Sequence, residues 1–208
     1  MNEPNSGRNR DSAVFLPAGS ITLALRGEST CGIMFEVQDG PEEFPTKNVR
    51  LGKVVLEPKM ERHVSLVAGN TGSLLRSLFK ADEQLQTAVE EYIQSWNLVY
   101  QRTGQLYQAR RVDSVPLDGR RVRRYRETII ERVSILDAEE FYENLAQFLP
   151  PRAAADLAVP PHHVTLYTLH CPEEPEPERL GISITSEREW QERVVRQIHP
   201  EELEVESE

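Results

Sequence analysis

Length, composition and charge limit what this chain can be. Its 208 residues suffice for one domain, or two small lobes, with a hydrophobic core. A net charge of −10 at pH 7 argues against a non-specific duplex-DNA binder, which would carry a basic surface. No run approaches the about 20 apolar residues of a membrane span, and the first residues lack the apolar stretch of a signal peptide. The two cysteines, Cys31 and Cys171, form neither a CxxC motif nor a disulfide framework. We expect a cytoplasmic monomer with reduced cysteines.

The first half of the chain combines strand patterns with one helix. Residues 1–12 are polar and are expected to be disordered, and a single domain is expected over residues 13–198. Apolar residues recur at three- and four-residue spacing from Leu85 to Tyr100, which predicts a helix with Asp82 as its N-cap. Strand patterns precede this helix, at residues 20–25, 32–38, 52–58 and 62–68.

The second half repeats this alternation of strands and helices. A helix is expected to begin at Asp137 in a capping box with Glu140, and a last helix at Ser186, with Trp190, Val194 and Ile198 on one face. The acidic tail at 199–208 is expected to be disordered. Strand patterns cover residues 104–113, 120–135, 162–169 and 180–184. This order of elements predicts an α+β fold with antiparallel sheet.

One tetrapeptide pattern occurs twice, as His-Val-Ser-Leu at 63–66 and as His-Val-Thr-Leu at 163–166. Residues i and i+2 of a strand share a face. The histidine and the hydroxyl residue of each tetrapeptide therefore lie side by side, while the two apolar residues turn to the core. The four polar residues are His63 with Ser65 and His163 with Thr165. The alternative is that each histidine is a strand residue hydrogen-bonded to a neighbour.

The doubled pattern resembles the motifs of the 2H phosphoesterase superfamily. The resemblance covers residues 20–198 in the order of elements, and the first motif carries serine where threonine is more usual. It implies a bilobal α+β fold in which two antiparallel sheets flank a central cleft, with helices packed on the outside. It also implies that the two motifs face each other across that cleft. No helix pattern precedes the first motif, although the resemblance leads one to expect a helix there.

The chemistry of these residue types fits the hydrolysis of a cyclic phosphodiester. Opening the ring needs a base for the attacking water and an acid for the departing sugar oxygen, and histidine can serve as either. The hydroxyls of Ser65 and Thr165 would donate to the phosphoryl oxygens. The expected substrate is a 2′,3′-cyclic phosphate at an RNA end or a small cyclic nucleotide. The scheme requires neither a metal nor a cofactor, and it leaves open which of His63 and His163 is the acid.

Three further residues are candidates for substrate binding. Tyr167 follows Thr165 by two residues, so it is expected on the same strand face, where it could stack on a base or ribose; a purely structural hydrogen bond is the alternative. Nine arginines against four acidic residues give residues 102–132 a local charge of +5. Within this segment Arg121 and Arg123 are candidates for phosphate or RNA contact, and an exposed hairpin is the alternative.

Two other functions remain open from the sequence. His162, His163, His170 and Cys171 are residue types that bind zinc, but neighbouring histidines of a strand point to opposite faces. The second alternative is a non-catalytic module that binds RNA or protein on the same fold. Two complete motifs favour the enzyme, because a binding module does not need two imidazoles with adjacent hydroxyls.

Overall fold

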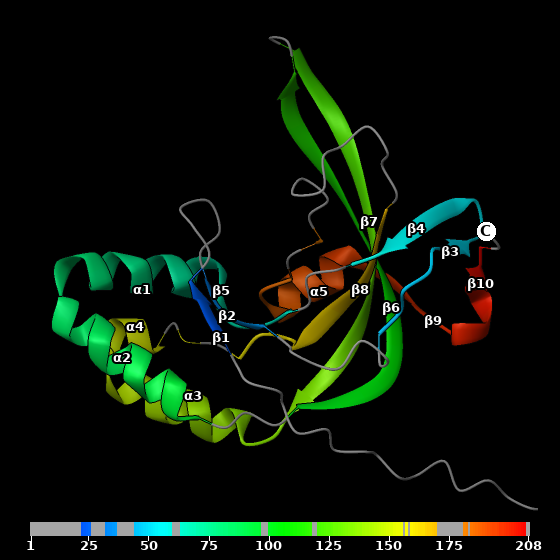
Figure 1. The fold of residues 1–208 in the computed structure, drawn as a ribbon. Helices are drawn as coiled ribbons and strands as arrows, with labels where there is room; N and C mark the ends of the chain where they lie inside the picture. Colours follow the sequence, from blue (N-terminus) through cyan, green and yellow to red (C-terminus); the bar gives the residue numbers. More distant parts are fainter. Residues whose placement is uncertain are drawn as a thin grey trace, which may run out of the picture.

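The computed structural model describes residues 22–25, 32–36, 44–59, 63–96, 100–117, 120–155, 157, 159–169, 181–182 and 184–206. Over these residues the chain has an α+β fold built on antiparallel strands, which confirms the fold class at this coarser level (Figure 1). No helix within these ranges has the length and hydrophobicity that crossing a membrane requires.

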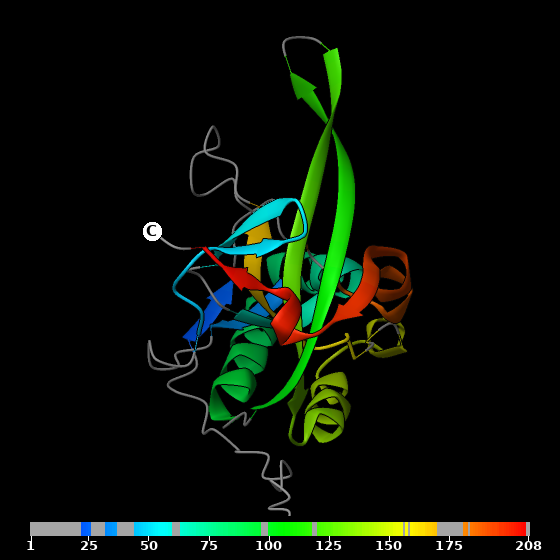
Figure 2. The same cartoon turned by 90° about the vertical axis from the view of Figure 1, so that its right-hand side faces the viewer.

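Each doubled tetrapeptide begins a strand, and the two strands belong to different sheets. The first lies at the edge of a three-stranded sheet with the order β1-β2-β5, and the second lies in the middle of a seven-stranded sheet with the order β10-β3-β4-β8-β7-β6-β9. The smaller sheet comprises β1 Thr22–Leu25, β2 Gly32–Glu36 and β5 His63–Ala68. The larger, curled sheet (Figure 2) comprises β3 Val49–Leu51, β4 Val54–Pro58, β6 Tyr100–Leu117, β7 Arg120–Ile135, β8 His163–Leu169, β9 Val194–Ile198 and β10 Glu204–Val205.

Four helices gather on one side of the molecule, around the end of β5 (Figure 1). They are α1 Gly69–Ala81, α2 Glu83–Ser95, α3 Ala138–Gln147 and α4 Pro151–Ala155. Their apolar faces bury Leu75, Ile93, Phe141 and Leu145 together with Leu66 of β5. The fifth helix, α5 Glu187–Arg193, packs against the larger sheet through Trp190.

Strand β7, next to β8 in the larger sheet, separates two further core clusters. Ile129 and Val133 contribute to a cluster that also contains Val164 and Leu166 of β8. Ile130 belongs to a different cluster, with Ile184 and Trp190 among its members. Odd-numbered residues of β7 therefore face the first of these clusters, and even-numbered residues face α5, as the two-residue period of a strand requires.

The sequence predicted N-terminal caps for three helices, and the structure confirms two of them. The side chain of Asp82 accepts a hydrogen bond from the Leu85 amide at 2.9 Å, which confirms it as the N-cap of α2. Ser186 likewise caps α5. The capping box expected at Asp137 is absent, because this residue has a left-handed φ of 59° and its side chain makes no cap hydrogen bond. Helix α1 was not predicted, since its Gly-Asn-Thr-Gly start is a poor helix former and buried packing stabilises it instead.

The C-terminal end differs from the sequence prediction in two ways. The helix expected to continue from Ser186 to Ile198 ends at Arg193, and the chain goes on as β9, which pairs with β6. Residues 199–206, expected to be a disordered tail, form a 3₁₀ turn at Pro200–Glu202 and then β10, which pairs with β3. Both segments are ordered because each pairs with the edge of a strand, β9 with β6 and β10 with β3. The expected disorder of residues 1–12 lies outside the described residues.

Candidate active site

The two motifs pack against each other through their apolar residues. Val64 of β5 shares a buried cluster with Val164 and Leu166 of β8, and each of these side chains is at most 4% exposed. Leu66 is also buried, in the helical cluster. The burial expected for the apolar residues of both motifs is therefore confirmed. Strand alternation turns the histidine and the hydroxyl residue of each motif away from the cluster that holds its valine.

The backbone fixes the tautomer of His163. This side chain is 9% exposed, and its Nδ1 lies 2.8 Å from the carbonyl oxygen of Pro161. A carbonyl can only accept, so Nδ1 carries a proton and the lone pair of the neutral ring is on Nε2. Burial lowers the pKa of His163, and the hydrogen bond to Pro161 opposes this only in part. His163 is therefore a neutral imidazole near pH 7, with its basic nitrogen oriented by the chain.

A cation and an indole ring lie beside His163. In the pairing of β7 with β8, Arg132 is opposite His163. The guanidinium carbon of Arg132 lies 5.2 Å from the ring centroid of Trp190, within the range of a cation–π contact. The same indole meets the His163 ring edge-on, with 6.3 Å between centroids. An exposed positive charge therefore lies next to the imidazole.

The hydroxyl residue of the second motif is closely covered. Thr165 is opposite Ile130 and lies on the same face of β8 as His163. A Cβ added at Gly181 would come within 3.1 Å of Thr165 Oγ1 and 3.4 Å of its Cγ2. The absence of a side chain at Gly181 therefore lets the backbone approach the threonine and leaves its hydroxyl in place.

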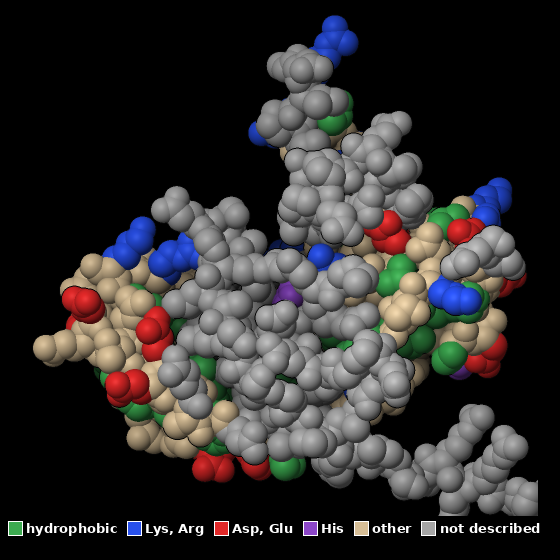
Figure 3. Space-filling view, viewed as in Figure 1, with side chains coloured by type: hydrophobic (Ala, Val, Ile, Leu, Met, Phe, Trp, Pro, Cys, Tyr) green, Lys and Arg blue, Asp and Glu red, His purple; other side chains and the backbone are tan. Residues whose placement is uncertain are grey.

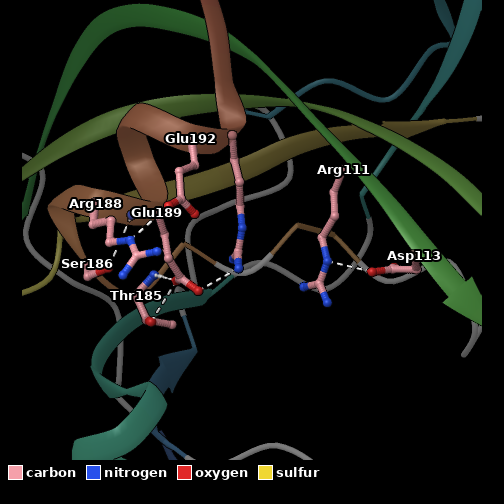
Figure 4. A network of polar contacts seen from close by, with 8 residues as sticks. Arg111, Asp113, Thr185, Ser186, Arg188, Glu189 and Glu192 are labelled. Carbon is pink, nitrogen blue, oxygen red and sulfur yellow. Dashed lines mark hydrogen bonds and ion pairs between the residues drawn. The ribbon is translucent and has the colours of Figure 1, made fainter.

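Polar contacts within residues 185–193 fix the first turns of α5 (Figure 4). Ser186 accepts a hydrogen bond from the Glu189 amide at 3.2 Å. The Glu189 carboxylate in turn accepts from the Thr185 amide and hydroxyl, both at 2.7 Å, and pairs with Arg193 at 2.5 Å. This cap fixes the first turn of α5, and so fixes Trp190, which lies in that helix next to His163.

A buried chain of hydrogen bonds links the two motif strands. The hydroxyl of Tyr142 donates to the carbonyl oxygen of Leu66 in β5, at 2.5 Å. Since that hydroxyl has one proton, the Nε2 atom of His162, 3.1 Å away, must donate to the Tyr142 oxygen. Burial, His163 and Arg132 lower the pKa of His162 to about 4, so the ring is neutral. His162 therefore tethers the start of β8 to β5 through helix α3.

A cavity of about 930 Å³ opens beside this tether. His162, Arg132 and Pro161 contribute to its wall. Its other ionisable side chains are all carboxylates, namely Asp137, Glu139, Glu140, Glu143 and Glu187. With His162 neutral, one arginine faces five carboxylates, so the cavity disfavours an anionic ligand.

The structure places Tyr167 on the opposite side of β8 from His163 and Thr165. The register between β7 and β8 shifts so that Tyr167 is opposite Ile129 while Thr165 is opposite Ile130. Leu166 is the extra residue of this bulge, and a bulge reverses the face of the residues that follow. Tyr167 accordingly belongs to the buried cluster of Val164, at 8% exposed. The expectation that it shares the face of His163 was wrong, because strand alternation is interrupted.

The structure does not bring Arg121 and Arg123 to this site. Both side chains are exposed near the outer end of β7, and being odd-numbered they share the strand face of Ile129 rather than that of Arg132. Nine residues separate Arg123 from Arg132, which corresponds to about 30 Å of strand. Arg121 and Arg123 are therefore distant from the residue that is opposite His163.

The zinc alternative falls partly outside what the structure describes, because His170 and Cys171 lie beyond the described part of β8. Among the residues that are described, no group of three or more His, Cys, Asp or Glu side chains could hold a metal ion. Comparisons of the chain with protein-family models, with curated proteins and with solved structures found no match.

Sequence reasoning missed four residues that shape the site. Trp190 was expected only as part of a helix face, and Arg132 is one of nine arginines in its segment, with no local feature that sets it apart. Gly181 lies against Thr165 and Tyr142 donates to Leu66, and in each case the two residues are far apart in the sequence. The contact of His163 with Pro161 gave no sequence signal either, because it uses a backbone oxygen that every residue has.

Proposed function

We propose that this protein is a metal-independent phosphoesterase of the 2H type. It hydrolyses a 2′,3′-cyclic phosphate, at an RNA end or in a small cyclic nucleotide, to a phosphomonoester. The observation that carries the proposal is the buried cluster that Val64 shares with Val164 and Leu166, since it brings the strands of the two motifs, β5 and β8, close together. In the proposed arrangement, two lobes flank a central cleft, with helices on the outside.

His163 is the general base in this proposal. Its neutral ring and its Nε2 lone pair suit it to remove a proton from water as the water oxygen attacks phosphorus. His63 is the general acid. It gives its proton to the sugar oxygen as the bond between that oxygen and phosphorus breaks. His163 is assigned as the base, so the half-buried His63 is the remaining imidazole for the acid.

Hydroxyls and one guanidinium would stabilise the charge that develops on the phosphoryl oxygens. Ser65 and Thr165 are each two residues from a histidine, on the same strand face, and both are partly accessible. Arg132 adds a positive charge beside His163. Donors fixed in advance lower the barrier because they do not have to reorganise during the reaction.

The test is hydrolysis of a 2′,3′-cyclic mononucleotide in excess chelator. His63→Ala and His163→Ala should each lower turnover by about 10²–10⁴, and the double variant should lose less than the product of the two. Ser65→Ala and Thr165→Ala should cost about 10–10³. His199→Ala removes an exposed histidine from the C-terminal turn and should leave turnover unchanged.

The pH profile distinguishes the two roles. Turnover should rise as pH passes the lowered pKa of His163 and fall again as His63 loses its proton. Activity that disappears with chelator and returns with zinc or manganese would reject the mechanism. Full turnover in both His63→Ala and His163→Ala would also reject the mechanism. If RNA binding then depended on the arginines of β7, the non-catalytic binding module would be the better description.

A further inference from the structure

The strands β6 and β7 extend beyond the rest of the sheet as a two-stranded arm (Figures 1 and 2). β9 pairs with β6 only from Leu106 to Ala109, and β8 pairs with β7 only from Thr128 to Arg132. Residues 110–117 and 120–127 therefore pair only with each other among the described strands. An isolated two-stranded ribbon is marginally stable in water, so this arm depends on cross-strand contacts of its own.

Charge sets the arm apart from the rest of the chain. Residues 110–126 contain seven arginines and two aspartates, whereas the whole chain has a net charge of −10. Asp113 pairs with Arg111 at 2.5 Å and with Arg126 at 2.8 Å on one face of the ribbon. In the space-filling view, cationic side chains stand at the outer end of the arm (Figure 3). The surplus of positive charge favours a polyanionic partner.

The other face of the ribbon combines arginines with an exposed aromatic ring. Val112 and Tyr125 are opposite each other in the register and share this face with Arg121 and Arg123. Tyr125 is 43% exposed and Val112 57%. Both Arg121 and Arg123 are exposed, and neither forms an ion pair with another of the described residues.

The hydroxyl of Tyr125 is fixed by a hydrogen bond to a buried carboxylate. Its hydroxyl donates to Glu127 Oε2 at 2.6 Å, and Glu127 is only 1% exposed. Arg110 Nε pairs with the same carboxylate at 3.1 Å, and Gln108 donates to its other oxygen. Burial and the neighbouring Glu127 raise the pKa of Tyr125, so the phenol is neutral. A ring fixed at its hydroxyl end and exposed on its body loses little entropy when a flat ligand stacks on it.

We propose that this arm face binds single-stranded RNA, with a base stacked on Tyr125 and phosphates contacting Arg121 and Arg123. A cationic track with an aromatic platform is the combination by which proteins bind single strands without regard to sequence. The inference deepens the proposed function, on which it rests for the choice of RNA. It replaces Tyr167, which is buried, by Tyr125 as the stacking residue.

The position of the arm predicts a dependence on RNA length. Arg123 is about 30 Å of strand from the residue opposite His163. A stacked single strand rises about 3.4 Å per nucleotide, so about nine nucleotides span this distance. A mononucleotide or a trinucleotide held at His163 therefore cannot reach Arg123, which is also on the other strand face, so only a longer RNA such as a 12-mer can contact the arm face.

The test measures binding of a product-like RNA 12-mer, which ends in a 3′-phosphate, by fluorescence anisotropy over a salt series. Tyr125→Ala should weaken binding by about 5-fold to 100-fold, and Tyr125→Phe, which keeps the ring, should weaken it much less. The double variant Arg121→Ala, Arg123→Ala should lower the slope of log affinity against log salt by about 1.4. Arg152→Ala removes an exposed arginine of α4 and is the matched control.

Two further measurements separate the outcomes. Turnover of a cyclic mononucleotide should be unchanged in the arm variants. If 12-mer binding in the arm variants equals that of Arg152→Ala, the inference is wrong, whether or not the enzyme is active. If the arm variants lose 12-mer binding but the wild-type protein turns over no cyclic phosphate, the proposed function is wrong and the RNA-binding inference for the arm is supported. If the variants instead abolish self-association in sedimentation runs and leave RNA binding intact, a second copy of the chain is the occupant and the RNA inference is overturned.

Discussion

The buried His162 should make the folded state sensitive to mild acid. Its ring is 7% exposed and donates from Nε2 to Tyr142, so a second proton would have to enter at Nδ1 inside the protein. Burial, the neighbouring His163 and Arg132 lower the pKa from its ordinary value of 6.5 to about 4. The unfolded chain therefore binds a proton between pH 6.5 and pH 4 that the folded chain does not bind, and stability falls as pH falls through this window.

The size of the effect follows from the two pKa values. With 6.5 in the unfolded state and about 4 in the folded state, linkage gives a loss of about 2.5 kcal/mol in the free energy of unfolding between pH 7.5 and pH 4.5. Almost none of this loss occurs above pH 7. Carboxylates and His163 add their own pH dependence, so the contribution of His162 has to be isolated by comparison with a variant.

His162→Gln provides that comparison, because glutamine does not titrate and its amide can donate to Tyr142. Urea unfolding followed by circular dichroism at pH 7.5 and pH 4.5 gives the loss for each protein. The wild type should lose about 2.5 kcal/mol more than the variant. The contribution of His163 should largely cancel in this difference. Equal losses in the two proteins, or a larger loss in the variant, would refute the buried, neutral state of His162.

Three other substitutions test the packing around the site. Tyr142→Phe removes a hydroxyl that satisfies two buried groups and should lower the free energy of unfolding by about 2 kcal/mol; a loss below about 0.5 kcal/mol in urea unfolding would contradict the tether. Gly181→Ala places a Cβ 3.1 Å from Thr165 Oγ1 and should lower turnover about 10-fold with little change in thermal stability; unchanged turnover would show that the hydroxyl has no fixed role. Glu131→Gln leaves the half-buried Arg102 without its carboxylate partner and should cost about 3 kcal/mol; unchanged urea unfolding would show that this ion pair is dispensable.

The sequence by itself determined the features that depend on near neighbours. Strand alternation, with its period of two, is enough to predict that Val64 and Val164 are buried. The N-cap of α2 follows from Asp82 and the amide three residues later. The charge of the arm is likewise a property of a short segment, and the turn between two strand patterns already predicted a hairpin.

Tertiary structure decided the features that depend on which strands meet. The bulge at Leu166 moved Tyr167 into the core, and it exists only in the pairing of β8 with β7. The spacing of Trp190, Val194 and Ile198 fits a helix, but the free edge of β6 drew residues 194–198 into a strand. The pairing of β7 with β8 also set Arg132 opposite His163. Register and edge pairing join residues far apart in the chain, so their free energies are absent from any local window, whereas periodicity and capping act between residues a few positions apart.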